Sequence, residues 1–435
     1  MSSRPKLLFL CHTLPFPPDG GVWIRTYHVL RLLARAFDIH LLCFERSSSS
    51  VNGGPATIAE CRHALSRFAG VEVFPIPQKH RRLRYVWDHL RSTVARRAYT
   101  TYLYESAAFR ARLEAILRST NVALVHVDSL DLAAYLPECR HVPVVCSHPD
   151  VESALLRRRA AVERVKWRSA YLGYQARLRE TVEREWCARV ALNVVVSEND
   201  RVTLKRIAPA SHTSVVPNGV DTNEFQPGGA AGTGIGYVGG LLWFPNLDAL
   251  EFFGAEILPR IRSAAGDVPT VWIGAASSDQ RRDYRERLDV EVTGYVDDVR
   301  PSMRACACHI VPLRVGGGTR LKILNSWAMG KPVVSTSIGC EGLAAVDGQN
   351  ILIRDDPREF ASAVLAVLGD AALRERLGAA GRATAERHYS WNVIGRELIE
   401  TYLTVANGGC RTAAPAIAPA RAGYAHSQIQ PLHRT

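Results

Sequence analysis

Short apolar runs alternate with longer amphipathic stretches along the first half of the chain. Residues 6–11 form an apolar run that leads into a proline-rich loop, and Trp23, Tyr27, Leu30 and Ala34 then recur at helical spacing. Helical sequence, including a long helix expected over about 151–189, separates the further strand-like runs, which lie at 39–44, 71–76, 123–127, 142–146 and 191–196. Such alternation predicts a parallel sheet with helices on both faces.

The same pattern starts again after residue 230. Residues 234–240 form a strand-like run that ends in glycines, and a helix is expected over about 248–261. Later strand-like runs, again separated by helical sequence, lie at 270–273, 290–293, 309–312, 332–335 and 350–353. The predicted fold class is α/β, with two tandem Rossmann-like, doubly wound parallel-sheet domains joined near 209–227.

The end of the chain has a different character. A last helix is expected over about 391–403, and after Asn407 the sequence is rich in Gly, Ala and Pro and has no period. We expect an N-terminal domain over 1–208, a C-terminal domain over 209–387, a helical segment over 388–406 and a disordered tail over 407–435.

Composition narrows the class of protein. The chain has 435 residues, of which 47% are hydrophobic and 22% charged, as in soluble proteins of two or three domains. It has no apolar run of the ~18–20 residues that a membrane helix needs, and the run at 7–10 is too short for the core of a signal peptide. Ten cysteines show no CxxC spacing and no zinc-ligand cluster, so we expect buried thiols in a reducing, cytoplasmic compartment.

The chain is basic, with 54 Lys and Arg against 42 Asp and Glu. This excess favours anionic partners, which include nucleic acid, a membrane face or a phosphorylated substrate. Residues 79–97 hold seven Lys or Arg and one acid, Asp88, interleaved with apolar residues. This segment predicts either a surface for an anionic membrane or a solvated helix face. Aromatic residues accompany the arginines, but no nucleic-acid-binding motif does, so no nucleic-acid partner is expected.

Glycine turns follow the first strand of each half. They are Gly20 with Gly21, and Gly239 with Gly240. In open parallel sheets such turns expose backbone N–H groups at helix N-termini, where ligands bind. Neither turn matches a dinucleotide fingerprint or a P-loop. Together they indicate a cleft between the two halves.

The segment 312–322 reads Pro-Leu-Arg-Val-Gly-Gly-Gly-Thr-Arg-Leu-Lys and combines several anion-binding features. A strand is expected to end at Pro312, three glycines follow, and Arg320 and Lys322 lie at the start of the next helix. Backbone donors, a helix N-terminus and two cations would converge there on one anion. The alternative is a glycine-rich turn with solvated cations.

With these segments together, the chain resembles the retaining glycosyltransferases of the GT-B fold, in the large family 4 group. The motifs that carry the resemblance occur in the family's order, at 17–25, 196–197, 216–221, 237–240, 245–246, 293–298, 312–322, 328–335 and 341–343. They span about residues 6–405, more closely in the second domain than in the first, where acceptor specificity usually lies. The resemblance implies two domains that face a central cleft, the second binding the donor, and a C-terminal helix that crosses back onto the first.

The resemblance also implies roles for single residues. The residues that would surround the donor diphosphate are Gly20, Gly21, Arg25, Gly239, Gly240, Arg320 and Lys322. Those that would surround the nucleoside and its ribose are Tyr295, Gly317, Gly318, Thr319, Asn325 and Glu341. Arg320 and Lys322 would stabilise the charge on the leaving nucleoside diphosphate. No D-x-D triplet occurs, in keeping with the metal independence usual in this fold, and no cofactor is expected.

Two positions depart from the family's pattern. Relatives commonly have two glutamates eight positions apart around this helix, and the corresponding residues here are Gly317 and Asn325. Asn325 can still hydrogen-bond a ribose hydroxyl, though without a charge, and Glu341 is a second candidate for this site. The departure keeps a non-catalytic nucleotide-sugar-binding protein as an alternative.

His148 and Asp150 follow a strand-like run in the first domain. Relatives often place a histidine here, close to the sugar, which makes His148 the first candidate for a catalytic residue and Asp150 the second. The local alignment also allows Pro149 at the histidine's position. A histidine without a catalytic role is the alternative.

The resemblance implies transfer of a sugar from a UDP-, GDP- or ADP-linked donor to a hydroxyl group, with retention of anomeric configuration. The acceptor would be a sugar, a lipid-linked molecule or a small molecule, on a route to a polysaccharide, a glycolipid or a glycosylated product. Another GT-B enzyme, such as a sugar-nucleotide epimerase, is the enzymatic alternative. The protein is expected in the cytoplasm, and at the inner membrane face if residues 79–97 bind lipid.

Overall fold

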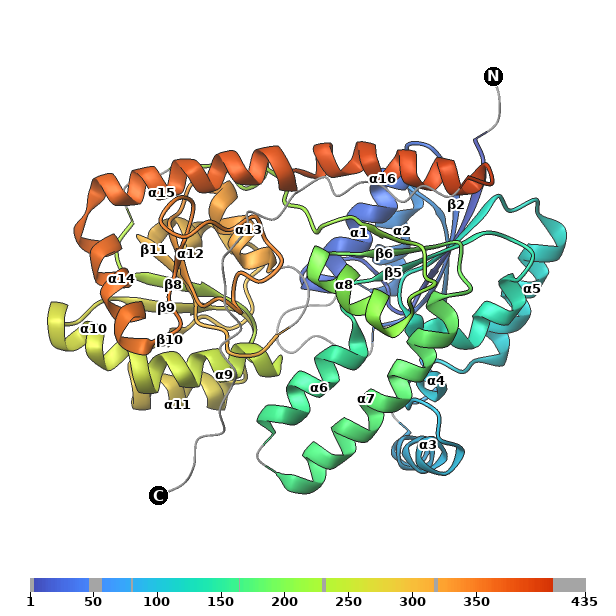
Figure 1. Cartoon of the computed structure of the whole chain (residues 1–435), viewed down its shortest axis with the longest axis horizontal. Coiled ribbons are helices and arrows are strands. Elements are labelled where there is room, and N and C mark those ends of the chain that lie inside the picture. Colours follow the sequence, from blue (N-terminus) through green and yellow to red (C-terminus); the bar gives the residue numbers. More distant parts are fainter. Residues whose placement is uncertain are drawn as a thin grey trace.

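The apolar runs form two separate parallel sheets in the computed structural model, which describes residues 4–46, 57–79, 81–163, 165–228, 232–316 and 320–409 (Figure 1). The strands of the first sheet are β1 (Lys6–Cys11), β2 (Asp38–Phe44), β3 (Gly70–Phe74), β4 (Leu124–Val127), β5 (Val144–His148), β6 (Leu192–Val195) and β7 (Thr213–Val215). Those of the second are β8 (Ile235–Val238), β9 (Thr270–Ile273), β10 (Glu291–Val292), β11 (Cys308–Val311), β12 (Val333–Ser335) and β13 (Leu352–Ile353). The strand orders are β3-β2-β1-β4-β5-β6-β7 and β10-β9-β8-β11-β12-β13, with parallel pairing throughout. The predicted fold class is confirmed.

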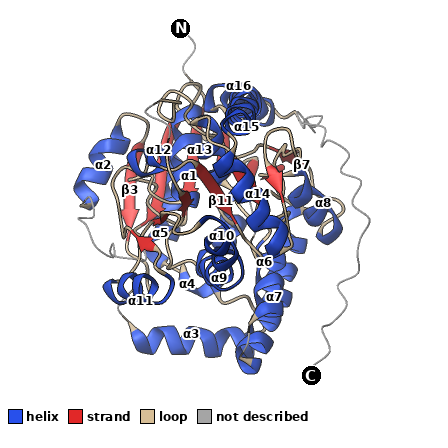
Figure 2. Cartoon of the chain, turned by 90° about the vertical axis from the view of Figure 1, so that its left-hand side faces the viewer, coloured by secondary structure: helices blue, strands red, loops and turns tan. Residues whose placement is uncertain are grey.

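Helices surround both sheets (Figure 2). In the first unit they are α1 (Gly21–Leu33), α2 (Ile58–Ser66), α3 (Arg82–Ala95), α4 (Thr100–Leu103), α5 (Ala107–Ser119), η1 (Leu130–Cys139), α6 (Glu152–Val162), α7 (Lys166–Cys187) and α8 (Glu198–Ile207). The later helices are α9 (Phe244–Phe252), η2 (Phe253–Ile257), α10 (Leu258–Ala265), α11 (Ser278–Leu288), α12 (Arg300–Ala305), α13 (Leu321–Ala328), α14 (Pro357–Gly369), α15 (Ala371–Thr384), η3 (Ala385–Tyr389) and α16 (Trp391–Ala406). Polar side chains fix several starts: Ser106, Ser197 and Asp356 accept backbone N–H bonds at the first turns of α5, α8 and α14.

Packing on both faces of the sheet explains why β1 is apolar at every position after Lys6. Leu8 and Leu10 belong to the core on one face of the first sheet, and Leu7 and Phe9 belong to the core on the other. Successive side chains of a strand point to opposite faces, so a strand covered on both sides needs apolar residues at every position. The second sheet has its own core, which includes Tyr237, Trp272 and Trp327.

The C-terminal helix α16 crosses back onto the first unit, as expected. The Trp391 ring stacks on His28 of α1 with centroids 4.7 Å apart, and a methyl group on Gly395 would lie 2.6 Å from Leu32. The Tyr402 hydroxyl lies 2.8 Å from Nδ1 of the buried His126. Helix α16 therefore completes the core of the first unit.

Three local expectations need correction. The helix expected over 151–189 is two helices, since α6 ends at Val162 and α7 begins at Lys166, and neither glycine nor proline marks this break in the sequence. The helix expected over 248–261 begins earlier and contains the π-helical turn η2 just before Pro259, which lacks a backbone N–H. The short strand β7 was not predicted, and it extends the first sheet beyond residue 208 into the expected junction.

Among the described residues, no helix combines the length and the apolar character needed to cross a membrane. The cysteines that the structure describes are buried, as predicted. The expected tail from residue 407 lies mostly outside the described residues, since these end at 409.

Candidate active site

The turns at the carboxyl ends of both sheets meet between the two units. A methyl group in place of the Gly21 hydrogen would lie 3.9 Å from Cδ1 of Leu321, at the start of α13. On the same side, Arg158 of α6 donates a hydrogen bond of 2.6 Å to the carbonyl of Gly316. The strand ends that the sequence marked as ligand sites therefore face one another, as predicted.

Local packing already requires glycine at two of the predicted positions. A methyl group on Gly20, which precedes α1, would lie 2.7 Å from the ring of Trp23. Gly239 has a φ of 159°, and a methyl group there would lie 2.7 Å from Nδ2 of Asn246. Close packing thus explains these glycines, and contact of their turns with a diphosphate remains a prediction.

Arg25 is buried within α1, where it ties the helix to the junction between the units. Its Nη1 donates to Oδ1 of Asn218 over 2.8 Å and to the carbonyl of Pro217 over 3.3 Å. Burial lowers the pKa of Arg25 to about 10. The structure therefore gives Arg25 a positioning role, and its predicted contact with a diphosphate stays a prediction.

Arg320 is buried and Lys322 is partly buried at the start of α13, so neither is a fully solvated cation. Arg320 is 3% exposed and donates from Nη2 to the carbonyl of Ile338 over 3.2 Å. Lys322 donates to Oδ1 of Asn246 over 2.8 Å and to the Tyr237 hydroxyl, and its Nζ lies 4.0 Å from the centre of that ring. Burial lowers the pKa of both cations, that of Lys322 well below its usual value.

Both side chains could offer positive charge to an anion at this place, and their contact with a diphosphate remains a prediction. Lys322 forms no ion pair with a carboxylate among the residues that the structure describes. A buried ammonium held only by neutral groups is costly until an anion approaches it. The neighbouring Gly317, Gly318 and Thr319 lie outside the described residues.

His148 and Asp150 occupy different environments. His148 is 4% exposed, its Nε2 lies 2.9 Å from Oδ1 of Asn193, and burial lowers its pKa to about 4. Burial raises the pKa of Asp150 well above its usual value, although the charges of Arg320 and Arg158 oppose this shift. His148 is thus a neutral, buried histidine packed into the first unit, whereas Asp150 lies near Arg158 of α6 and Arg320 of the second unit.

The predicted nucleoside residues that the structure describes, Tyr295, Asn325 and Glu341, all belong to the second unit. Tyr295 follows β10, and burial and the negative charge of Asp19 in the first unit raise its pKa. Asn325 is partly exposed on α13. Glu341 is ion-paired with Arg158 across the two units, with Nη1 2.9 Å from Oε2. Their roles toward a nucleoside remain predictions.

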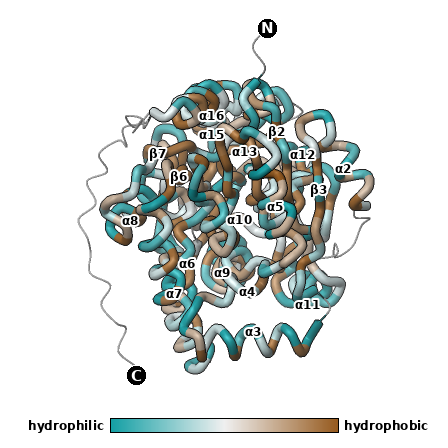
Figure 3. Tube along the Cα trace, turned by 90° about the vertical axis from the view of Figure 1, so that its right-hand side faces the viewer, coloured by the Kyte–Doolittle hydropathy of each residue, from teal (hydrophilic) through white to brown (hydrophobic). Residues whose placement is uncertain are grey.

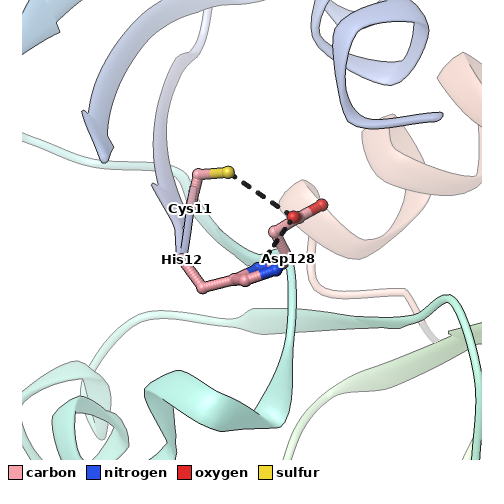
Figure 4. A group of neighbouring side chains, drawn as sticks. All are labelled: Cys11, His12 and Asp128. Carbon is pink, nitrogen blue, oxygen red and sulfur yellow. Dashed lines mark hydrogen bonds and ion pairs between the residues drawn. The ribbon is translucent and has the colours of Figure 1, made fainter. Parts of the chain in front are cut away.

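One cluster escaped sequence analysis. Cys11, His12 and Asp128 meet at the ends of β1 and β4 (Figure 4). Nδ1 of His12 lies 3.3 Å from Oδ2 of Asp128, and the Thr26 hydroxyl lies 3.0 Å from both carboxylate oxygens. Among the described residues this trio has the spacing for a metal ion, but the Cys11 thiol already donates to the Thr13 carbonyl over 2.7 Å. The rule that ligands gather at strand ends would have found His12 and Asp128.

Two family models match the chain. The model described as "Glycosyltransferase Family 4" covers residues 19–224, and that described as "Glycosyl transferases group 1" covers residues 232–370. Phosphatidyl-myo-inositol mannosyltransferase of Mycobacterium tuberculosis is 30% identical over 166 residues, which are 36% of this chain and 44% of that protein. Lipopolysaccharide core biosynthesis glycosyltransferase LpsE of Rhizobium meliloti is 32% identical over 146 residues, 30% of this chain and 41% of that protein. The match thus spans less than half the length of these curated relatives.

Solved structures resemble nearly the whole chain. Sucrose-phosphate synthase from Thermosynechococcus elongatus superposes with a TM-score of 0.69 at 16% identity, covering 93% of this chain and 100% of that one. The Anabaena protein HepE in complex with UDP superposes with a TM-score of 0.64 at 15% identity, covering 92% and 100%. At these identities the likeness shows the fold alone.

Proposed function

Because the chain is a GT-B glycosyltransferase of the family 4 type, we propose that it transfers a sugar from a nucleotide-sugar donor to an acceptor hydroxyl with retention of anomeric configuration. The observation that carries the proposal is the pair of cationic side chains at the start of α13, the buried Arg320 and the partly buried Lys322. A donor diphosphate would satisfy the buried charge of Lys322, and both cations would stabilise the charge that builds on the leaving group. A nucleotide-linked donor is consistent with HepE, a protein of similar fold whose structure is in complex with UDP.

A donor screen tests this function. Wild-type protein is incubated with UDP-, GDP- and ADP-linked sugars, with and without EDTA, and release of the nucleoside diphosphate is measured. We expect hydrolysis or transfer with one donor class, no loss with EDTA, and retained configuration by NMR of the product. Binding of a sugar nucleotide without turnover would favour the non-catalytic alternative, and isomerisation of its sugar would favour an epimerase.

We further propose that the acceptor is borne by an anionic membrane, which α3 contacts from the cytoplasmic side. Helix α3 lies at the edge of the molecule, away from both sheets (Figures 2 and 3). Its outward residues are apolar and largely exposed: Leu83 88%, Val86 64%, Trp87 58%, Leu90 53% and Val94 76%. They recur at helical spacing and therefore form one stripe.

The side of α3 that faces the rest of the protein is polar and its outer side is apolar, which is the reverse of the usual arrangement in a surface helix. Asp88 is 1% exposed and accepts a hydrogen bond from Gln78, and Ser92 is 0% exposed and accepts one from the Gln175 amide of α7. A helix whose acidic residue is buried and whose apolar stripe is exposed is suited to contact with an apolar environment on its outer side. On the adjoining α7, Trp167 is 69% exposed.

The positive charge around α3 indicates which partner binds its exposed apolar stripe. Seven Lys or Arg lie within residues 79–97, so an anionic bilayer complements it better than a second copy of this basic chain. The relatives named for phosphatidyl-myo-inositol and for lipopolysaccharide core are consistent with a lipid-borne acceptor.

A further inference from the structure

Cys11, His12 and Asp128 meet at the carboxyl edge of the first sheet, at the point where its strand order reverses (Figure 4). Cys11 is the last residue of β1, His12 follows it, and Asp128 follows the neighbouring β4. Open α/β sheets bind ligands at this switch point. Each of the three side chains offers one atom that can bind a metal ion, and these atoms lie within 4.8 Å of one another.

The spacing of the three atoms fits a tetrahedral zinc ion. Oδ2 of Asp128 lies 3.3 Å from Nδ1 of His12 and 3.5 Å from Sγ of Cys11. Zinc binds nitrogen and oxygen at about 2.0–2.2 Å and thiolate sulfur at about 2.3 Å. With tetrahedral angles, these bond lengths separate the ligand atoms by about 3.3–3.6 Å. The two measured separations are therefore those of neighbouring ligands around one zinc ion.

Nδ1 of His12 is a buried nitrogen that lacks a hydrogen bond. Within the part of the chain that the structure describes, no group meets it in hydrogen-bond geometry, although the carboxylate of Asp128 is close. Buried polar atoms are nearly always satisfied, so one without a hydrogen bond indicates a missing partner. A metal ion between Nδ1 and Oδ2 would be that partner.

Asp128 is held in place as an ionised ligand. The Thr26 hydroxyl of α1 lies 3.0 Å from both carboxylate oxygens, and Nε2 of the fully buried His126 lies 3.7 Å from Oδ1. Such outer contacts commonly orient the carboxylates that bind metals. Burial acts to raise the pKa of Asp128, but its contacts with His12 and His126 hold that pKa below its usual value.

Cys11 supplies the ligand that selects the metal. Burial raises the pKa of its thiol, so a metal ion must displace the proton, and the thiol then gives up its hydrogen bond to the Thr13 carbonyl. Mg²⁺ and Ca²⁺ prefer oxygen ligands alone. A thiolate, an imidazole and a carboxylate together suit Zn²⁺.

We propose that Cys11, His12 and Asp128 bind a Zn²⁺ ion, with water as the fourth ligand. The ion replaces the thiol proton of Cys11, and the imidazolium proton of His12 where this is present, and both protons pass to solvent. Asp128 and the Cys11 thiolate balance the charge of the ion, whereas the nearby Asp131 is already paired with Arg179 over 3.0 Å. The ion is not required for the proposed sugar transfer, which is expected to persist in EDTA, so the two proposals are tested separately.

Cobalt reports on this site in the full chain, because Co²⁺ occupies zinc sites and is coloured. Metal-free wild-type protein is titrated with Co²⁺ without any substrate, and Zn²⁺ is then added. We expect one Co²⁺ per chain, the visible bands of a tetrahedral ion and a near-ultraviolet band for charge transfer from thiolate to cobalt. An equivalent of Zn²⁺ should remove all of these bands.

Single substitutions assign the ligands. Cys11→Ser should abolish the charge-transfer band, and both Cys11→Ser and His12→Ala should weaken Zn²⁺ binding more than about hundredfold, measured by competition with a chelator. Thr26→Val removes only a contact to Asp128 and should weaken it about ten- to hundredfold, the usual effect of such outer contacts. Cys43→Ser, at a buried cysteine of the adjacent β2, is the matched control and should change neither measurement.

Thermal unfolding separates loss of the site from loss of the fold. Zn²⁺ should raise the melting temperature of the wild type and of Cys43→Ser, because it binds only the folded site. It should not raise that of His12→Ala, which replaces a side chain that is 15% exposed and therefore leaves the core intact. Absence of Co²⁺ binding by the wild type, a spectrum without the thiolate band, or wild-type Zn²⁺ affinity in His12→Ala would overturn the proposal.

Discussion

Arg158 of α6 and Glu341, which follows β12, form an ion pair between the two units, with Nη1 2.9 Å from Oε2. The same guanidinium donates to the carbonyl of Gly316. Both side chains are partly exposed, at 43% and 30%, so the pair itself contributes only about 0–1 kcal/mol. The contact therefore aligns two turns of the cleft and leaves Glu341 able to exchange Arg158 for a ligand.

If Glu341 binds the ribose of the donor, replacing Glu341 should weaken nucleotide binding more than replacing its ion-pair partner Arg158. Glu341→Gln should weaken nucleoside diphosphate binding about tenfold, since a hydrogen bond to a charged group contributes about 1.5–3 kcal/mol. Arg158→Gln should change it less than about threefold, because the exposed pair is weak. Calorimetry checks both, with Glu375→Gln on the exposed side of α15 as control. Equal losses in the two variants would instead assign Glu341 to interdomain alignment.

Arg320 and Lys322 should both bind the donor diphosphate. Arg320→Ala and Lys322→Ala should each weaken nucleoside diphosphate binding roughly ten- to hundredfold, because each removes a charged hydrogen-bond donor. Lys331→Met, which removes a lysine just before β12 at the opposite edge of the sheet, is the matched control. Unchanged affinity in both variants, with an intact fold, would contradict the assignment.

Lys322 also predicts a pH effect. Burial holds its pKa well below the usual value, so above that pKa the free protein has a neutral amine. An approaching diphosphate raises this pKa, and binding should then take up as much as one proton. Calorimetry in buffers of different ionisation enthalpy measures this uptake. It should disappear in Lys322→Met and at pH values below the lowered pKa, where the lysine is already charged.

Most of the fold was predictable because hydrophobic periodicity reports burial directly. The run at 39–44 became β2 almost unchanged, since a strand covered on both faces needs apolar residues at its buried positions. The turn between α6 and α7 was missed because no glycine or proline marks it, and β7 because three residues are too few to show a period. Contacts between distant residues, and not local pattern, determine such features.

The candidate site was predictable only in part. Glycines and cations at strand ends drew attention to this place, and Arg320 and Lys322 lie together at the start of α13, whereas their contact with a donor stays a prediction. The burial of His148 was not predictable from the sequence, because the spacing of the motif does not show that Asn193 of the neighbouring β6 contacts the ring. The pairing of His12 with Asp128 likewise joins residues more than a hundred positions apart.

Asn325 tests the departure from the family's glutamate. If it fills the ribose position, Asn325→Ala should weaken nucleoside diphosphate binding several-fold, because one neutral hydrogen bond contributes about 0.5–1.5 kcal/mol. Asn325→Glu should be tolerated or improve binding, since it restores a carboxylate at this partly exposed place on α13. Asn223→Ala, at an exposed asparagine before β8, is the control. Loss of binding in Asn325→Glu with the fold retained would show that the nucleotide contacts of this chain differ from those of the family.

The outward stripe of α3 should bind anionic membranes. Wild-type protein should co-sediment with vesicles that contain phosphatidylglycerol but not with vesicles of phosphatidylcholine alone, and less at high salt, because each cation contributes up to about 1 kcal/mol near an anionic surface. Replacing Leu83, Trp87 and Val94 together by glutamine should abolish this binding without lowering the melting temperature, since these side chains are exposed. Val202→Gln removes an exposed valine from α8 and should have no effect.

Two results would assign α3 differently. Equal binding to neutral and anionic vesicles, or none to either, would leave a solvated helix face and favour a soluble acceptor. Association of the wild type into dimers without lipid, abolished by the same triple substitution, would make a second copy the occupant of the stripe. Light scattering at several protein concentrations distinguishes this case. The salt dependence is decisive for the membrane, because an apolar contact between two copies would strengthen with salt, whereas attraction to phosphatidylglycerol would weaken.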